Sequence, residues 1–162
     1  MKILGIDPGY DRLGIAILEK PAKGKESVIY SDCFTTSKKD NIYARLLQIG
    51  TEVSRLLDEF KPEKLAIETL FIDNNQKTAM RVSEARGIII YEAAKRGIPI
   101  FEYSPMEIKM AVTGDGTSDK ARIIKMVNLL VKLPAKKTHD DEYDAVAVAL
   151  TCSARNDAIS VP

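Results

Sequence analysis

The sequence predicts a mixed α/β sheet that is covered by helices on both faces. Apolar runs bounded by Gly and Pro open the chain, as is typical of antiparallel strands. Helical and short buried segments then alternate, which favours parallel strands, and helical periodicity fills the last third. The chain of 162 residues has the length of one domain. We assign residues 1–155 to that domain and residues 156–162 to a short C-terminal tail.

Three strands are predicted at the start of the chain. The apolar run Lys2–Asp7 ends at the turn residues Pro8-Gly9. Leu13–Leu18 contains β-branched residues, and Ser27–Thr35 follows a polar loop with an alternating pattern. Because the connections are short, we expect these strands to pair in antiparallel fashion, and this places Asp7 at the edge of the sheet.

The rest of the chain alternates helical and strand patterns. Asp40 is a plausible N-cap for a helix of regularly spaced apolar residues that stops at Lys61-Pro62. The later elements, in order, are a strand at Lys64–Glu68, a helix at Asn75–Arg96 with Gly97 as its C-cap, a strand at Ile98–Phe101, and helices at Pro105–Val112, Ser118–Leu133 and about Asp140–Ala154.

The predicted helix Asn75–Arg96 carries apolar residues on more than one side. Met80 and Tyr91 lie outside the stripe that a single core contact needs. One side can therefore face the sheet, while the other either completes the interior of one subunit or contacts a second copy. The sequence leaves these two interpretations open.

Charge and composition exclude several classes of protein. Lys and Arg number 24 and Asp and Glu 23, so the net charge of +1 excludes a uniformly basic coat for nucleic acid. The apolar runs are far shorter than the roughly 20 residues that span a bilayer, and we expect neither a signal peptide nor membrane association. Cys33 and Cys152 have no metal-ligand spacing. We interpret both as small core residues of a protein in the reducing cytoplasm.

Candidate functional residues are acids at the ends of predicted elements. Asp7 ends the first strand, and Glu68 ends the buried run of the fourth. Asp141 and Asp144 lie one turn apart on the last helix and share a face, although Asp140 and Asp144 would share one as well. The alternative for the last helix is a capping box from Thr138 to Asp141, and Asp7 alone could be a turn residue.

Three acidic segments that converge would need cations to offset their repulsion. Carboxylate oxygens suit Mg²⁺ or Mn²⁺, and two such ions about 4 Å apart promote phosphodiester hydrolysis. Six basic residues and no acid lie between Lys120 and Lys137, among them Arg122 and Lys125. This stretch is either a solvated face or a path for DNA phosphates.

Four motifs in register resemble the RuvC family of Holliday-junction resolvases over nearly the whole chain. They are Ile6-Asp7-Pro8-Gly9 with Gly14, Ala66-Ile67-Glu68 with Phe71, Ala85-Arg86-Gly87, and Asp141-x-x-Asp144 followed by Ala145–Ala149. The resemblance implies a ribonuclease-H-like fold and a homodimer. It also implies Mg²⁺-dependent paired nicking of four-way DNA junctions, and a RuvA/RuvB branch-migration helicase as partner.

The resemblance also implies roles for individual residues. Asp7, Glu68, Asp141 and Asp144 match the four acidic metal ligands of the family, which favours Asp141 over Asp140. Two lysines match basic residues that can hold the scissile phosphate, and one phenylalanine matches a residue that stacks on a base. These three residues are Lys109, Lys120 and Phe71. The alternatives are two surface lysines and a phenylalanine packed under its own loop.

The sequence departs from the family pattern at Tyr10, Asp11, Thr69, Asp115 and Arg122, which affects the expected DNA contacts rather than the chemistry. Three other functions remain as alternatives. They are a nuclease of the same fold that cuts RNA or RNA–DNA hybrids, an actin-like ATPase or sugar kinase suggested by Asp7-x-Gly9-x-x-x-x-Gly14, and a non-catalytic protein that binds junctions.

Overall fold

A five-stranded mixed sheet forms the centre of the molecule. The computed structural model describes residues 1–70, 76–134 and 139–155, and the sheet has the order β3-β2-β1-β4-β5. The strands are β1 (Lys2–Asp7), β2 (Arg12–Glu19), β3 (Ser27–Thr35), β4 (Lys64–Glu68) and β5 (Ile100–Tyr103). β1, β2 and β3 pair in antiparallel fashion, while β4 runs parallel to β1 and β5 parallel to β4. The predicted order of antiparallel and then parallel strands is confirmed.

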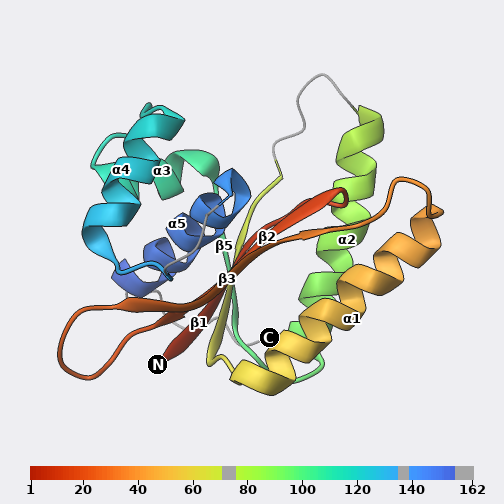
Figure 1. Ribbon diagram of the computed structural model, residues 1–162, viewed down its shortest axis with the longest axis horizontal. Coiled ribbons are helices and arrows are strands. Elements are labelled where there is room, and N and C mark those ends of the chain that lie inside the picture. The colour runs from red at the N-terminus through yellow and green to blue at the C-terminus, as the bar shows by residue number, and fades with distance from the viewer. Residues whose placement is uncertain (71–75, 135–138, 156–162) are drawn as a thin grey trace.

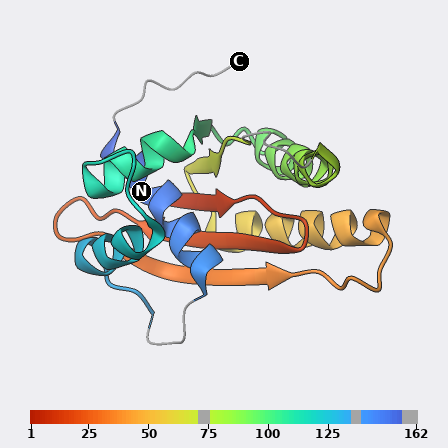
Figure 2. The same ribbon diagram turned by 90° about the horizontal axis from the view of Figure 1, so that it is seen from above.

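Helices cover both faces of this sheet, as predicted (Figure 1). One face carries α1 (Ile42–Phe60) and α2 (Gln76–Ala94), and the other carries α3 (Pro105–Thr113), α4 (Lys120–Leu130) and α5 (Asp140–Ala154). Figure 2 shows α5 crossing the strands at close range, and its main contacts are with β1 and β2. No helix within the described ranges is long and apolar enough to cross a membrane.

The alternation of side chains along the strands separates two hydrophobic cores. In β1, Leu4 and Ile6 belong to the core under α1 and α2, whereas Ile3 belongs to the core under α5. Because residues two apart in a strand share a face, Asp7 falls on the same face as Ile3. The same alternation in β4 puts Glu68 on the face of Ala66, which also belongs to the core under α5. Both acids therefore end their strands on the face that α5 covers.

Two glycines allow α5 to lie directly on the sheet. A Cβ atom at Gly5 would stand 2.3 Å from the carbonyl oxygen of Ala145, and one at Gly14 would stand 2.1 Å from that of Asp141. Any side chain at either position would push the helix away, because the close approach of two backbones leaves no room for it. Gly5 and Gly14 thus fix the height of α5, and with it the position of Asp141 above the end of β1.

The predicted N-cap of the first helix is wrong by one residue. Asn41 caps α1, because its side chain accepts a hydrogen bond of 2.9 Å from the backbone N–H of Ala44. Asp40 instead accepts a hydrogen bond of 2.9 Å from the side chain of Gln48. Two neighbouring residues of equal capping preference cannot be separated by propensity.

Other boundaries shift where a cap decides them. The last strand begins at Ile100 rather than Ile98, because the N–H of Ile98 closes the end of α2 on Ala93 and Gly97 adopts a φ of +68°. The helix predicted from Ser118 begins at Lys120, because Asp119 accepts a hydrogen bond of 2.8 Å from the N–H of Arg122. Thr138 and the tail 156–162 lie outside the described residues.

Candidate active site

Asp7 and Glu68 end two neighbouring strands at the same edge of the sheet. β1 and β4 are parallel, and Ile6 lies opposite Ile67, so the next residue in each strand is one of the two acids. Both are partly buried on the face that α5 covers. Two residues far apart in the sequence therefore become neighbours through strand register alone.

The first two turns of α5 bring the remaining acids to this edge. The backbone of Asp141 lies against Gly14, the register partner of Asp7. Asp144, one turn further, lines a pocket of about 220 Å³ together with Glu68, Lys109 and Lys120. The sequence alone shows only separate acidic segments, and the fold brings them together.

Burial and mutual repulsion perturb this group of acids. The pKa of Asp7 is raised to about 7, first by burial and then by the charges of Glu68, Asp144 and Asp141, while the charge of Lys120 lowers it. Burial likewise raises the pKa of Glu68 to about 7, with Asp144 adding to the effect and Lys109 opposing it. These carboxylates therefore act on one another at close range, and their ionised forms need a positive partner.

Lys120 supplies part of that positive charge. Its Nζ atom lies 3.1 Å from Oδ2 of Asp144 and 3.5 Å from Oδ2 of Asp140. Burial raises the pKa of Asp144, and the hydrogen bond and charge of Lys120 work against that rise. The predicted phosphate-binding lysine is thus an ion-pair partner of the acids in this structure.

Asp141 has two partners from the antiparallel strands. The Nε atom of Arg12, at the start of β2, lies 3.7 Å from its Oδ2. The thiol of Cys33, on β3, donates a hydrogen bond of 3.4 Å to the same oxygen. Burial, followed by the charge of Asp141, raises the pKa of the Cys33 thiol to about 11. The expectation that Cys33 is a core residue is wrong, because it is only partly buried and faces this acid, whereas Cys152 is buried in the core.

The choice between Asp140 and Asp141 follows from their surroundings. The side chain of Asp140 is 66% exposed and pairs with Lys120, whereas that of Asp141 is 18% exposed and its charge acts on Asp7. Helical spacing could not separate them, because both lie within one turn of Asp144. Asp141, rather than Asp140, is therefore the acid at the start of α5 whose charge acts on Asp7.

The chemistry of the donor set fits a hard divalent cation. Asp7 and Glu68 end their strands at this edge, and burial and neighbouring charges, rather than hydrogen bonds, account for their raised pKa values, so their carboxylate oxygens are available as ligands. Within the described ranges, no three His, Cys, Asp or Glu side chains already stand at metal-ligand spacing. In this structure the positive charges of Lys120 and Arg12 partly offset the negative charges of the acids. Four carboxylates and no histidine or thiolate favour Mg²⁺ or Mn²⁺ over Zn²⁺.

Comparison with known proteins identifies the family. A family model described as "Crossover junction endodeoxyribonuclease RuvC" matches residues 3–152. The chain belongs to the RuvC family. The RuvC protein of Thermosipho melanesiensis is 46% identical over 149 residues, which cover 92% of this chain and 94% of that relative.

Solved structures of RuvC share the fold of this chain. The Thermus thermophilus RuvC structure matches it with a TM-score of 0.86 and 30% identity, covering 95% of this chain and 94% of that one. The structure of T. thermophilus RuvC in complex with a Holliday junction substrate matches with a TM-score of 0.87 and 29% identity, covering 94% and 93%. The ribonuclease-H-like fold implied by the resemblance is thereby confirmed, and the ATPase or kinase alternative is set aside.

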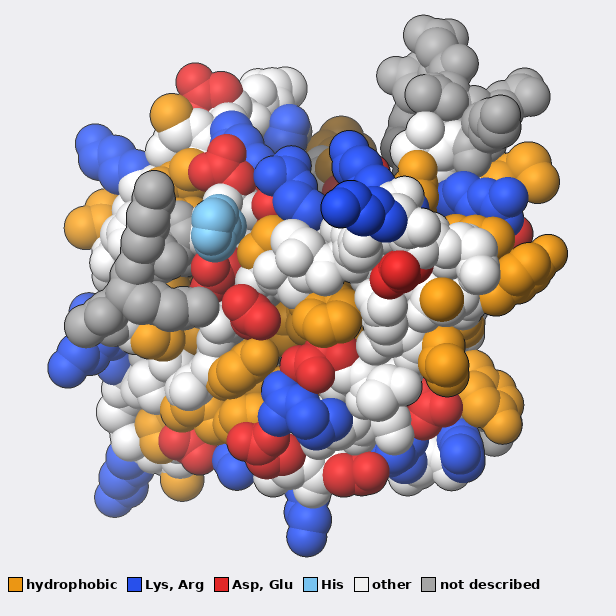
Figure 3. Space-filling model, turned by 45° about the vertical axis from the view of Figure 1, so that its right-hand side comes forward, with side chains coloured by type: hydrophobic (Ala, Val, Ile, Leu, Met, Phe, Trp, Pro, Cys, Tyr) orange, Lys and Arg blue, Asp and Glu red, His pale blue; other side chains and the backbone are white. Residues whose placement is uncertain are grey.

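Two departures from the RuvC family pattern are partners of each other. The guanidinium of Arg122 donates a hydrogen bond of 3.2 Å to the carboxylate of Asp115. Lys125 is exposed further along α4. Phe71 lies outside the described residues, as do Lys136 and Lys137 of the basic stretch. In the view of Figure 3, basic and acidic side chains are interspersed, in line with the balanced charge.

Arg86 is a residue near the site to which the sequence analysis gave no role. Its Nε atom donates a hydrogen bond of 3.1 Å to the backbone carbonyl of Glu68, and its guanidinium also pairs with Glu102 on β5. Arg86 therefore ties α2 to the end of β4 and fixes the backbone that carries Glu68. In the sequence, the Ala85-Arg86-Gly87 motif pointed to this residue, but its spacing could not show that Arg86 contacts β4.

Proposed function

We propose that the chain is a crossover junction endodeoxyribonuclease that resolves four-way DNA junctions by two symmetric nicks during recombination and repair. The observation that carries the proposal is the convergence of four carboxylates beside Lys109 and Lys120 at one edge of the sheet. Family membership and the named activity of the relatives support it, as does the junction substrate in the complex of T. thermophilus RuvC.

The acids are proposed as the ligands of Mg²⁺, with two ions per subunit and Mn²⁺ as a possible substitute. These ligands are Asp7, Glu68, Asp141 and Asp144. When bound, such a pair of ions supplies an activated water and stabilises the charge that develops on the leaving oxygen, which leaves 5′-phosphate and 3′-hydroxyl ends. The buried, mutually repelling acids favour this proposal, because a divalent cation relieves the repulsion that raises the pKa values of Asp7 and Glu68.

The two lysines of the pocket are proposed to hold the scissile phosphate. Lys109 acts on Glu68 through its charge, and Lys120, which lines the same pocket, reaches Asp144. A phosphate placed between them would be anchored beside the acids, and the fixed charges would favour the transition state. Arg122 and Lys125, on the exposed side of α4, would then contact the adjoining backbone. Phe71 remains a proposed base-stacking residue.

A second copy of the chain is proposed to dock on the faces of α1 and α2 that point away from the sheet. These helices leave a groove of about 730 Å³, and Tyr43, Leu47 and Tyr91 in its lining are 80%, 71% and 61% exposed. Apolar surface of this kind is typical of an interface. Because a C2 dimer presents two equivalent sites, it matches the approximate twofold symmetry of a four-way junction. A RuvA/RuvB helicase and a cytoplasmic location are proposed from the family alone.

The test is nicking of a labelled four-way junction in Mg²⁺, with linear duplex and an RNA–DNA hybrid as competing substrates. We expect paired symmetric nicks in the junction, no cutting after EDTA, and loss of cutting with retained binding in Asp7→Asn. Cutting of the hybrid in place of the junction would support the alternative nuclease. Binding without cutting in both Mg²⁺ and Mn²⁺ would indicate a junction-binding protein and overturn the proposal.

A further inference from the structure

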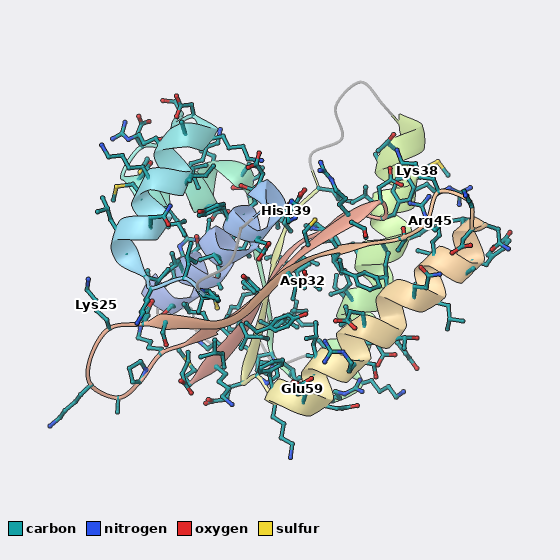
Figure 4. The ribbon with its side chains drawn as sticks, in the orientation of Figure 1. Lys25, Asp32, Lys38, Arg45, Glu59 and His139 are labelled. Carbon is teal, nitrogen blue, oxygen red and sulfur yellow. The ribbon has the colours of Figure 1, made fainter. Side chains whose placement is uncertain are left out.

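Strand β3 contacts the start of α5 through two side chains that share one face. Ser31 and Cys33 are two residues apart, so both point toward α5. The hydroxyl of Ser31 donates a hydrogen bond of 2.6 Å to Oε2 of Glu142, and the thiol of Cys33 donates to Asp141. Figure 4 labels Asp32, which lies between these two residues on β3, and His139, which precedes α5.

Glu142 is a buried acid that the proposed metal site does not use. It is 1% exposed, and Ser31 is 4% exposed. While Oε2 accepts from Ser31, Oε1 accepts a hydrogen bond of 3.0 Å from the backbone N–H of His139. A carboxylate buried in a protein is costly unless such bonds satisfy it. The contact therefore favours the rotation of α5 that places Glu142 against β3.

The rotation of α5 decides where its other acids point. Successive residues of an α-helix are turned by about 100°, so Asp141 and Asp144 project from one side of α5, and Glu142 projects from another. With Glu142 anchored on β3, the other two acids are turned toward Asp7, Glu68 and the pocket. A rotation of the first turn would move both at once.

We infer that Ser31 and Glu142 form a positioning pair, which holds the first turn of α5 so that Asp141 and Asp144 can share a divalent cation with Asp7 and Glu68. The inference rests on the proposed metal site and deepens it. Ser31 and Glu142 touch neither the metal nor the DNA, and act through Asp141 and Asp144. Groups that orient metal ligands in this way typically change metal affinity by about 10- to 100-fold when removed.

The test compares two serine-to-alanine variants that remove hydrogen bonds at opposite ends of α5. Ser31→Ala removes the hydrogen bond at the start of α5, and Ser153→Ala removes the hydrogen bond from Ser153 to Glu26 near its end. Both serines are buried, so the two variants should lose similar stability. Mn²⁺ affinity is measured by electron paramagnetic resonance, and amide hydrogen exchange of residues 139–144 is measured in EDTA.

We expect Ser31→Ala to weaken Mn²⁺ binding by about tenfold or more and to speed exchange in the first turn of α5. Ser153→Ala should leave both unchanged, and Ser31→Thr, which keeps the hydroxyl, should restore the affinity. Equal Mn²⁺ affinity in Ser31→Ala and the wild type would overturn the inference and leave the proposed function intact. If the wild type itself does not bind Mn²⁺, the proposed metal site is wrong and the inference falls with it.

Discussion

The Nζ atom of Lys120 lies 3.1 Å from Oδ2 of Asp144. A lysine that the sequence assigns to DNA phosphate thus neutralises one of the acids assigned to metal. Since a fixed cation and a divalent ion compete for the same carboxylate, Lys120 has two opposite effects. It stabilises the acids without metal, and it lowers their affinity for the metal.

Lys120→Gln should therefore bind Mn²⁺ several-fold more tightly than the wild type, while nicking of the junction falls by about 100-fold for want of the phosphate contact. Calorimetric titration and a nicking assay measure the two effects. Lys125→Gln is the control for the Mn²⁺ titration, because Lys125 is exposed on the same helix but lies outside the pocket that Lys120 lines. Weaker Mn²⁺ binding by Lys120→Gln would contradict the competition.

Asp7→Asn should stabilise the metal-free protein at neutral and alkaline pH. The pKa of Asp7 rises from 3.8 to about 7 in the folded state, first through burial, so folding favours the protonated form. The stability present below about pH 4 is then lost as the pH rises through 7. In EDTA at pH 8 the free energy of unfolding should increase by up to about 4 kcal/mol in Asp7→Asn, and at pH 4.5 the gain should fall to about 1 kcal/mol.

Urea unfolding in EDTA at the two pH values measures this effect. Asp58→Asn is the control, because Asp58 is exposed and its hydrogen bonds to Arg96 lower its pKa. This variant should not gain stability at pH 8. If Asp7→Asn is less stable than the wild type at pH 8, the prediction is wrong, because burial and the neighbouring acids then do not disfavour the ionised form of Asp7.

Arg45→Gln should destabilise the fold at the turn that follows Asp7. The Arg45 side chain is 9% exposed, and it donates to Thr36, to the carbonyl of Tyr10 and to Asp11. Removal of a buried charge from such a network costs about 1–3 kcal/mol. Lys38 pairs with the same Asp11 but is 83% exposed, so Lys38→Gln should cost less than about 0.5 kcal/mol. Figure 4 labels both residues. If urea unfolding shows that Arg45→Gln and Lys38→Gln lose equal stability, the prediction is wrong.

Met80→Glu should convert the proposed dimer into monomers that bind DNA weakly. Met80 lies on α2 and is 65% exposed, and a charge placed in an apolar interface loses its hydration without a partner. Met106→Glu is a matched control, because Met106 is 67% exposed but lies on α3, across the sheet from α2. Light scattering gives the mass of each variant. An unchanged dimer mass for Met80→Glu would move the interface elsewhere.

The sequence predicts the sheet and places Asp7 and Glu68 at the ends of their strands, because both features depend on local patterns. Alternation assigns each strand residue to a face, and Pro8-Gly9 marks the end of β1. The contacts of Asp141 with Arg12 and Cys33 could not be predicted in this way. They depend on the height and rotation of α5 over strands far away in the sequence, which Gly5, Gly14 and Glu142 decide.

The exact N-cap residue of α1 could not be predicted from the sequence. Asp40 and Asn41 are adjacent and chemically similar. In the structure, the side chain of Asn41 accepts the hydrogen bond from the first turn of α1. Arg86 shows a second limit, since its hydrogen bond to the backbone of Glu68 joins segments that share no local pattern. Helices and strands can be predicted from local sequence patterns, whereas a contact between two of them can be predicted only when their relative placement is known.

α5 contributes two of the proposed ligands as well as much of the core on its side of the sheet. It follows β1 and β4 in the chain, so the ribosome makes it after the segments that carry Asp7 and Glu68. A nascent chain that has exposed Asp7 and Glu68 therefore holds an incomplete set of ligands until α5 emerges and docks on Gly5 and Gly14. The proposed metal site is therefore assembled only together with the contact between α5 and the sheet, and not by β1 and β4 alone.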